Sequence, residues 1–391
     1  MRSANCASDS ASSPGRKAPS RLKARSTAAA PPGAASRSDI DSVWALRGMG
    51  RVGGLTAMPG PASNSVLQNI VLSDRTVKFP MTTPDVLISE VGPRDGLQSV
   101  AATMPTDSKL RWIDALHAAG VREIEVASFV PAKLLPQMAD AAEVVRHAIT
   151  LPGLTVMALV PNRKGAQAAL EAGVHKLTMP VSASVAHSLA NVRKTPTEMV
   201  EEVRAIAELR RAIAPQVKLE AGISTAFGCT LQGLVPEDDV IRLAAQCIEA
   251  GADESGLSDT VGYANPAQVR RLFKRLRAEL GAHAGAAHMH NTRGLGIANC
   301  LAAWDEGVRT FDASLGGLGG CPYAPGASGN AVTEDLVFMF EAMGVRTGID
   351  IEKLIAARAP LMAGLPGEPV YGMTPEAGLP KGFAQENTAH G

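Results

Sequence analysis

Residues 86–128 read VLISEVGPRDGLQSVAATMPTDSKLRWIDALHAAGVREIEVAS and contain the repeating unit on which the fold prediction rests. Two short apolar runs, Val86–Val91 and Glu123–Ser128, flank a longer amphipathic stretch at Asp107–Ala119. Runs of this length are typical of buried strands, and the longer stretch is typical of a helix that packs on a sheet. The segment therefore predicts a βαβ unit with parallel strands.

The same alternation continues along the chain and predicts eight strands in all. The six further strands are expected at Thr155–Val160, Lys176–Val181, Lys218–Ser224, Glu254–Leu257, Ala286–His290 and Thr310–Ser314. Helical patterns between them include Thr197–Ala214, Glu237–Ala250, Pro266–Leu280 and Leu295–Glu306. The strands fall within a length close to the roughly 250 residues of an α/β fold of the (β/α)8 TIM-barrel type. An open doubly wound sheet is the alternative, disfavoured because no G-x-G-x-x-G follows the first strand.

The composition excludes several functional classes. The 391 residues include 38 Lys and Arg against 38 Asp and Glu, so the formal net charge is zero. This balance argues against nucleic acid and anionic membranes as partners. The sequence also contains no run of eighteen apolar residues, the length that a membrane-spanning helix needs. The five cysteines form no C-x-x-C pair, which argues against a disulfide framework or thiolate zinc site and favours a reducing cytoplasm.

The N-terminal part differs from the rest in composition. Residues 1–38 are rich in Ser, Ala, Gly, Pro and Arg and contain one acid. Such a stretch cannot bury enough apolar surface to form a core, so we expect residues 1–80 to be a disordered or mis-assigned extension. Residues 81–391 are expected to form the barrel with a C-terminal helical or loop tail. A translation start at Met58 or Met81 and an organelle-targeting peptide are the other interpretations of the N-terminus.

Polar residues follow the expected strands where a barrel carries its chemistry. His288 and His290 lie in AAHMHNT at residues 286–292, and alternate residues of a strand point to the same face. Both rings can therefore enter the barrel mouth, although two hydrogen-bonded polar residues at a strand end are the simpler interpretation. Asp95, after the first strand, would add an oxygen ligand, and this mixture suits Mg²⁺ or Mn²⁺ better than zinc.

A glycine-rich loop, GGLGGCPYAPGASGN, follows the last expected strand at residues 316–330. Glycine allows backbone conformations and close approaches that other residues cannot adopt. We interpret the loop as a mobile segment that carries a reactive thiol at Cys321, and a connector with an incidental cysteine is the alternative. Arg94 and Asp95 similarly have a simpler interpretation, as a surface turn stabilised by its glycines.

The motifs GPRDGLQ, H-x-H and GLGGCPYAPGASGN, in this order, resemble those of the hydroxymethylglutaryl-CoA lyase family, barrel enzymes related to isopropylmalate and homocitrate synthases. The resemblance covers roughly Val86–Gly344, and the cysteine loop is its most specific part because the synthases lack it. It implies divalent-metal-dependent cleavage of the acyl-CoA substrate 3-hydroxy-3-methylglutaryl-CoA to acetyl-CoA and acetoacetate, a reaction of leucine degradation.

The resemblance also implies roles for individual residues. The implied metal ligands are Asp95, His288, His290 and Asn330; the implied catalytic residues are Arg94, Cys321, His288 and Glu125; and the implied substrate contacts are Arg94, Gln98 and Asp259. In the expected reaction the cation acidifies the substrate hydroxyl, Arg94 stabilises an enolate oxygen and Cys321 returns a proton to carbon. The group that removes the hydroxyl proton is left open between a metal-site histidine and Asp95.

Three positions depart from the family pattern. Asn291 stands where better known members have Asp, residues 99–101 read SVA in place of a segment with Glu-Lys, and residues 229–233 read CTLQG in place of CPYEG. These changes flank the acyl and CoA sites, so they bear on the substrate more than on the reaction. The alternatives are cleavage of citramalyl-CoA or of a longer branched 3-hydroxyacyl-CoA, a condensing acyltransferase and a non-enzymatic surface-binding protein. Whether the chain forms a homo-oligomer is left open.

Overall fold

Eight parallel strands close into a barrel in the computed structural model, which describes residues 84–319 and 329–385. The strands are β1 Leu87–Glu90, β2 Glu123–Ser128, β3 Thr155–Leu159, β4 Lys176–Ser182, β5 Lys218–Ser224, β6 Glu254–Ser258, β7 Ala284–His288 and β8 Thr310–Ala313. Each strand pairs with its sequence neighbours, and β8 pairs with β1 to close the ring. The predicted (β/α)8 barrel is confirmed.

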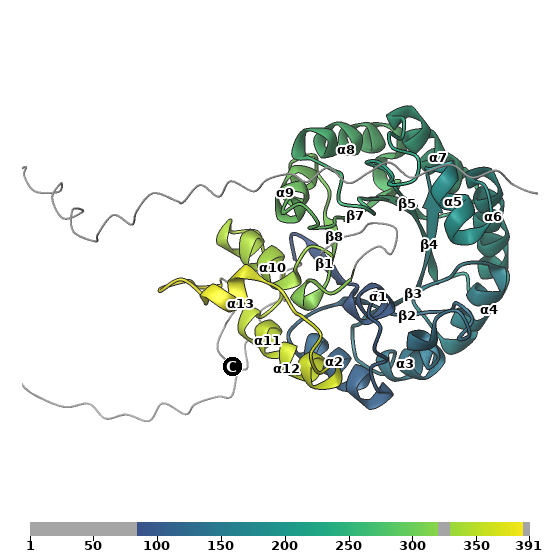
Figure 1. The fold of residues 1–391 in the computed structure, drawn as a ribbon. Helices are drawn as coiled ribbons and strands as arrows, with labels where there is room; N and C mark the ends of the chain where they lie inside the picture. The colour runs from purple at the N-terminus through teal and green to yellow at the C-terminus, as the bar shows by residue number, and fades with distance from the viewer. Residues whose placement is uncertain (1–83, 320–328, 386–391) are drawn as a thin grey trace, which may run out of the picture. The chain divides into compact units, whose positions relative to one another are not determined.

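Helices surround the strands on the outside of the ring (Figure 1). The α-helices are α1 Leu97–Ser99, α2 Thr106–Ala118, α3 Ala141–Ala148, α4 Arg163–Ala172, α5 Val185–Val192, α6 Pro196–Ile213, α7 Glu237–Glu249, α8 Pro266–Leu280, α9 Gly296–Asp305, α10 Thr333–Ala342, α11 Ile351–Ala356, α12 Arg358–Gly364 and α13 Met373–Ala377. A π-helical turn, η1 Gly92–Gly96, and the 3-10 turns η2 Pro136–Met138, η3 Gly281–His283 and η4 Leu315–Gly317 complete the elements. Within the described residues, no helix combines the length and the apolar character needed to cross a bilayer.

Local capping explains where the long helices begin. The Thr195 side chain accepts a hydrogen bond from the Glu198 backbone N–H, and the Glu198 carboxylate accepts one from the Thr195 backbone N–H, which forms a capping box before α6. The Asn265 side chain accepts from the Gln268 N–H and Pro266 occupies the first turn of α8. These side chains supply partners for helix-end amides, so α8 has the bounds expected from sequence and α6 begins one residue before its expected start.

The core lies between the strands and the surrounding helices, where large apolar side chains such as Trp112, Phe273 and Phe311 are fully buried. Phe311 of β8 packs on Phe340 of α10 with ring centroids 5.1 Å apart. The C-terminal helices α11 and α12 pack against α2, as Figure 1 also shows. The C-terminal segment thus covers the barrel beside β1 and β8, where the first and last strands meet.

The seventh strand differs from its expected bounds by two residues at each end. The seventh strand was expected at Ala286–His290, but β7 spans Ala284–His288 and His290 lies beyond it in an isolated antiparallel bridge with Asn330. The expectation that one strand presents both histidines is therefore wrong. The physical reason is that backbone hydrogen bonds from residues 329–331 replace the strand ladder after His288, as between Ala331 N and Met289 O at 2.9 Å.

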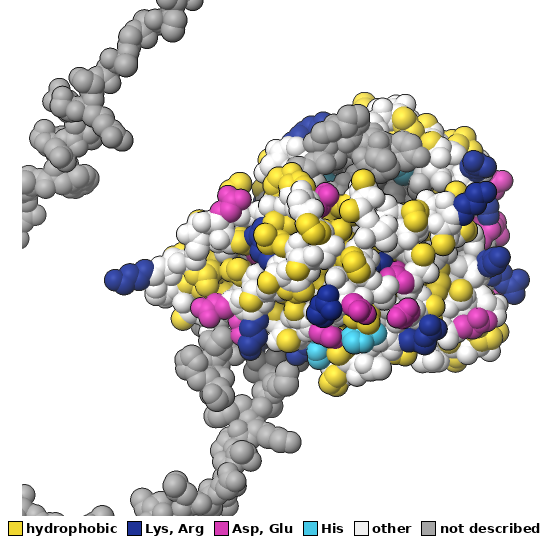
Figure 2. Space-filling view, turned by 60° about the horizontal axis from the view of Figure 1, so that its bottom comes forward, with side chains coloured by type: hydrophobic (Ala, Val, Ile, Leu, Met, Phe, Trp, Pro, Cys, Tyr) yellow, Lys and Arg dark blue, Asp and Glu magenta, His cyan; other side chains and the backbone are white. Residues whose placement is uncertain are grey.

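Positively and negatively charged side chains are intermixed on the molecular face drawn in Figure 2, mainly along its right-hand and lower edges. In the described residues, salt bridges also join neighbouring helices. Examples are Arg275 of α8 with Asp238 of α7, 2.5 Å apart, and Arg270 of α8 with Asp305 of α9, 2.7 Å apart. On this face the zero formal charge of the chain is thus distributed as a mixture of signs.

Candidate active site

A cavity of about 1170 Å³ opens at the carboxyl ends of the strands. Its lining includes the residues expected to form the site at the first, second and seventh strands: Arg94, Asp95, Glu125, His288 and His290. Catalytic groups of (β/α)8 barrels lie at this end because the loops there are independent of the packed barrel interior. The fold therefore brings together side chains that are almost 200 positions apart along the chain.

Asp95, His288 and His290 form a cluster whose candidate ligand atoms all lie within 4.8 Å of one another. The Nε2 atoms of the two histidines are 3.2 Å apart. This separation fits adjacent positions around an octahedral ion with bonds of about 2.1 Å, which places such ligands about 3 Å apart. Asn330 joins the cluster, because its amide nitrogen donates to Asp95 Oδ2 at 2.8 Å and to Leu318 O at 3.0 Å.

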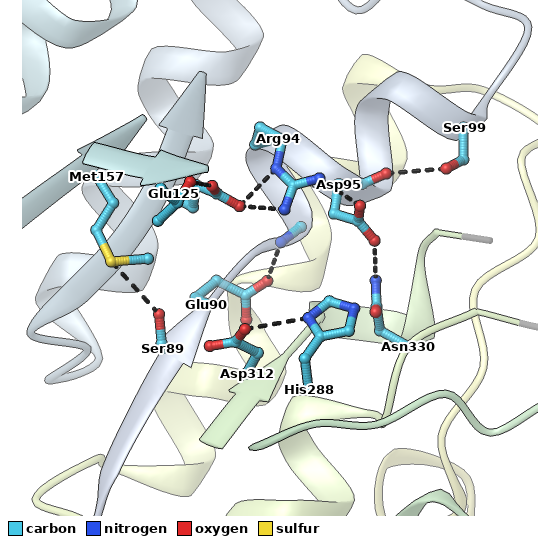
Figure 3. Close-up of polar contacts among 12 residues, drawn as sticks. Ser89, Glu90, Arg94, Asp95, Ser99, Glu125, Met157, His288, Asp312 and Asn330 are labelled. Atoms are coloured by element: carbon cyan, nitrogen blue, oxygen red, sulfur yellow. Dashed lines mark hydrogen bonds and ion pairs between the residues drawn. The ribbon is translucent and has the colours of Figure 1, made fainter. Parts of the chain in front are cut away.

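A carboxylate behind His288 sets the direction of its ring. His288 Nδ1 lies 3.1 Å from Asp312 Oδ2, as Figure 3 shows. With Nδ1 held in this way, Nε2 lies 3.2 Å from Nε2 of His290. Histidine ligands of metals commonly make such a contact through the nitrogen that faces away from the ion. Asp312 comes from β8, where it is the register partner of His288.

Burial and neighbouring charges set the protonation of the cluster. Burial alone would raise the pKa of Asp95, but the charge of Arg94 and the nearby histidines outweighs it and holds this pKa at about 2. Burial, with the charge of His288, lowers the pKa of His290 to about 4. Asp95 is thus an anion and His290 a neutral base near pH 7, which are the forms that bind a divalent cation.

The Arg94 guanidinium is held between two carboxylates, Asp95 on one side and Glu125 on the other. Burial opposes its charge, but these two partners outweigh burial and raise the pKa of Arg94. Glu125 also accepts a hydrogen bond from the Thr178 hydroxyl. The guanidinium is therefore a fixed positive charge at the edge of the cluster.

The backbone between Glu90 and Gly96 aims Arg94 and Asp95 at the cavity. The carbonyl oxygen of Val91 lies 3.1 Å from the N–H nitrogen of Arg94 and 2.7 Å from that of Asp95, which fastens the π-helical turn. A side chain at Gly92 would meet Glu90 Oε1 at 2.5 Å and Trp112 Cη2 at 2.9 Å. Only glycine leaves room for this turn between the buried tryptophan and the strand end.

Two of the residues selected from the sequence, Gln98 and Asp259, have no hydrogen bond to the cluster in the described residues. Gln98 lines the cavity but has no hydrogen bond to the cluster residues. Asp259 is buried outside the cavity lining, and its Oδ1 accepts from the N–H groups of Tyr263 and Ala264 at 2.8 and 3.2 Å. These hydrogen bonds stabilise the turn after β6, and the role of Asp259 as a substrate contact stays a prediction. Cys321 lies outside the described residues.

Sequence reasoning missed Asp312 and Thr178, which contact His288 and Glu125 respectively. Both are polar residues within expected strands of otherwise apolar character. Polar residues that alternate with apolar ones in a barrel strand point to the interior or the mouth, so this pattern was the available signal. Their partners were not identifiable, because the contacts depend on how neighbouring strands are aligned.

A closed barrel with a buried histidine–aspartate cluster at the carboxyl ends of its strands is the architecture of a (β/α)8-barrel enzyme. The chain belongs to the HMGL-like family, whose model matches residues 85–360. It is 42% identical over 272 residues to hydroxymethylglutaryl-CoA lyase YngG of Bacillus subtilis, a match that covers 70% of this chain and 90% of that protein. Relatives of this kind are carbon–carbon lyases.

Two further similar proteins have names or titles that mention coenzyme A or a CoA ester. The (R)-citramalyl-CoA lyase of Chloroflexus aurantiacus is 39% identical over 304 residues, which covers 75% of this chain and 95% of that protein. A solved structure of a hydroxymethylglutaryl-CoA lyase from Acinetobacter baumannii, in complex with coenzyme A and 3-methylmalate, aligns with a TM-score of 0.71 and 38% identity. That alignment covers 78% of this chain and 97% of the other.

Proposed function

We propose that this protein is a hydroxymethylglutaryl-CoA lyase. The observation that carries the proposal is the meeting of Arg94, Asp95, His288 and His290 at one cavity, with Asn330 hydrogen-bonded to Asp95, in a chain 42% identical to a lyase of this name. The reaction cleaves 3-hydroxy-3-methylglutaryl-CoA to acetyl-CoA and acetoacetate. The 3-hydroxyl loses its proton, the C2–C3 bond breaks as C3 becomes a ketone, and C2 of the thioester enolate accepts a proton.

The residues at the cavity fit a divalent cation, with Mg²⁺ or Mn²⁺ as the expected ions. Asp95 supplies a carboxylate oxygen, His288 and His290 supply imidazole nitrogens, and Asn330 supplies its amide oxygen, a donor set of hard and intermediate ligands. When bound, the cation acidifies the substrate hydroxyl and holds it beside the bond that breaks. Asp312 keeps His288 in the required orientation.

The protein groups around the cluster perform the remaining steps. Arg94, fixed by Glu125 and Asp95, donates to the oxygen on which enolate charge develops, and a buried donor of this kind needs no reorganisation during the reaction. The proposed acceptor of the hydroxyl proton is Asp95 or a histidine of the metal site. Cys321 is the proposed donor of the proton to C2.

The shape of the cavity supports an acyl-CoA as the substrate. It extends from the cluster to the end of α5, where Arg193 and Lys194 contribute to its lining. Among the described lining residues, the lysine and arginine side chains are Arg94, Arg193 and Lys194. Arg193 is exposed in a left-handed backbone conformation at φ 58°, and Lys194 pairs with Glu202. We assign Arg193 to the phosphates of CoA. Residues 99–101 read SVA and so contain no lysine that could take this role.

Two measurements test this function. Purified protein with Mg²⁺ should convert hydroxymethylglutaryl-CoA to acetyl-CoA and acetoacetate faster than it converts citramalyl-CoA to acetyl-CoA and pyruvate. Higher kcat/KM on citramalyl-CoA would replace the proposal with the second candidate, which the 39% identical citramalyl-CoA lyase favours. Arg193→Ala should raise KM for the CoA thioester but leave KM for the pantetheine thioester, which lacks the nucleotide phosphates, unchanged.

We place the enzyme in the cytoplasm. Cys229, Cys247 and Cys300 are buried free thiols, as expected for a protein of a reducing compartment.

A further inference from the structure

Two carboxylates behind the candidate active site, Glu90 and Glu334, are fully buried and have no part in the proposed chemistry. Glu90 is the last residue of β1, and Glu334 is the second residue of α10. Burial raises the pKa of Glu90 to about 7 and that of Glu334 to about 8, which shows that both positions oppose a free carboxylate charge. An apolar residue would avoid this desolvation, so the carboxylates need a reason to be there.

Glu90 joins three chain segments. Its Oε1 accepts hydrogen bonds from the backbone N–H groups of Gly92 and Leu315, each at 2.9 Å. Its Oε2 accepts from the Thr333 hydroxyl at 2.7 Å. These partners lie in the turn after β1, in the segment after β8 and at the start of α10, so one side chain ties together elements separated by up to 243 positions in sequence.

Glu334 holds the residue next to Leu315. Its two oxygens accept from the N–H of Gly316 at 3.2 and 3.0 Å, and Arg358 lies 3.6 Å from its Oε1. Gly316 has φ +65°, a conformation that is costly for other residues. The two carboxylates therefore fasten consecutive backbone amides at a point where the chain turns sharply.

Two of the four proposed metal ligands, Asp95 and Asn330, lie in or next to the tied segments. The turn that begins at Gly92 carries Asp95, and Thr333 follows Asn330 by three residues. Three residues after Leu315, the carbonyl oxygen of Leu318 accepts from the amide of Asn330, which donates as well to Asp95. The distance between Asp95 and Asn330 thus depends on segments that are all hydrogen-bonded to Glu90.

We infer that Glu90, assisted by Glu334, is a positioning residue that sets the relative placement of Asp95 and Asn330 for cation binding. The inference rests on the divalent-metal site proposed above. Among the described residues, Glu90 contacts the Gly92 backbone and the Thr333 hydroxyl of the ligand-bearing segments and no ligand side chain, so it acts on the cation only through these segments. Removing Glu90 should therefore weaken cation binding. Loss of a group that orients metal ligands typically lowers metal affinity by about 10- to 100-fold.

The test is a titration of the full-length protein with Mn²⁺, followed by the electron paramagnetic resonance signal of the free ion. Glu90→Ala should raise the dissociation constant at least about 10-fold. Glu90→Gln should stay within about twofold of wild type, because its amide oxygen keeps both backbone hydrogen bonds and its NH₂ group can donate to the Thr333 hydroxyl. Glu123→Ala is the matched control, since it removes a buried carboxylate at the opposite end of the barrel and should leave Mn²⁺ affinity unchanged.

The outcomes separate this inference from the proposed function. Wild-type protein that binds no Mn²⁺ overturns the metal site itself, whereas normal Mn²⁺ binding by Glu90→Ala overturns only the role of Glu90. A loss in Glu90→Gln as large as in Glu90→Ala, or an equal loss in Glu123→Ala, also overturns it. Should Glu90→Ala fail to fold, Thr333→Val must weaken Mn²⁺ binding and Thr333→Ser, which keeps the hydroxyl, must restore it.

Discussion

The two ends of the barrel each contain a cluster of buried charges, but the clusters differ in what surrounds them. At the amino ends of the strands, Lys176 lies among three carboxylates, with its Nζ 2.8 Å from Glu220, 2.6 Å from Glu254 and 3.8 Å from Glu123. We call these four residues the floor cluster. Burial opposes the charge of Lys176, but its acidic neighbours outweigh burial and raise its pKa well above the usual value.

The mouth cluster consists of Arg94, Asp95, Glu125, His288 and His290. All five residues line the cavity, whereas of the floor cluster only Glu220 reaches the described lining and the cation Lys176 does not. In the floor cluster the cation is enclosed by its partners, while the mouth cluster presents two imidazole nitrogens and a carboxylate at one point. The comparison teaches that buried charge alone does not mark a functional site. The atoms must also face a space that a ligand can enter.

The largest effect should follow from removing a mouth ligand. His290→Ala should lower kcat by at least about 10³-fold, because the several kcal/mol of charge stabilisation that a cation supplies would be lost. The melting temperature should change little, since His290 packs at the cavity and not in the apolar core. Steady-state kinetics with and without Mg²⁺, before and after chelation, measure this. A rate that is insensitive to chelation in wild type would contradict the metal role.

The floor cluster should show the opposite pattern. Lys176→Met leaves three buried carboxylates without their cation, and breaking such a cluster should lower the free energy of unfolding by about 3–5 kcal/mol. We expect kcat/KM of the folded fraction to stay within about threefold of wild type, since Lys176 lies outside the cavity lining. Urea unfolding followed by circular dichroism, paired with kinetics, measures both. A stable but inactive variant would show that the floor takes part in function.

A smaller effect is expected for the thiol assigned to proton transfer. Cys321→Ser should lower kcat by about 10²-fold with little change in KM, as for an interaction made in the transition state. Cys247→Ala and Cys300→Ala serve as controls, because burial raises the pKa of each of these thiols to about 12 and they lie outside the cavity lining. Equal kcat values for Cys321→Ser and wild type would return Cys321 to an incidental role.

The smallest effect is expected outside both clusters. A protein that begins at Met81 should keep kcat/KM within about twofold of the full chain, a difference of about 0.4 kcal/mol in barrier. The reason is that β1 begins at Leu87 and the composition of residues 1–80 cannot sustain a core. Expression and kinetics of both forms compare them directly. An inactive or insoluble short form would show that the N-terminal residues contribute to the barrel or to an interface.

The sequence alone determined the barrel and most residues of the mouth. Eight apolar runs separated by amphipathic stretches are a local signal, because strand and helix periods are written in consecutive residues. Polar residues after those runs marked Arg94, Asp95 and the two histidines, since parallel strands place their carboxyl ends at one end of a barrel. The family motifs added Asn330 and Glu125, which the structure brings to the same cavity or its edge.

Only the tertiary structure decided how these residues are held. The end of β7 at His288, the contact between Asp312 and His288, and the turn position of Asp259 depend on the alignment of neighbouring elements. The hydrogen bond between Thr333 and Glu90 spans 243 positions, a separation at which no local pattern relates one residue to the other. Propensity and period act over a few residues, whereas the partners of a buried polar group are chosen by whichever distant segments pack against it.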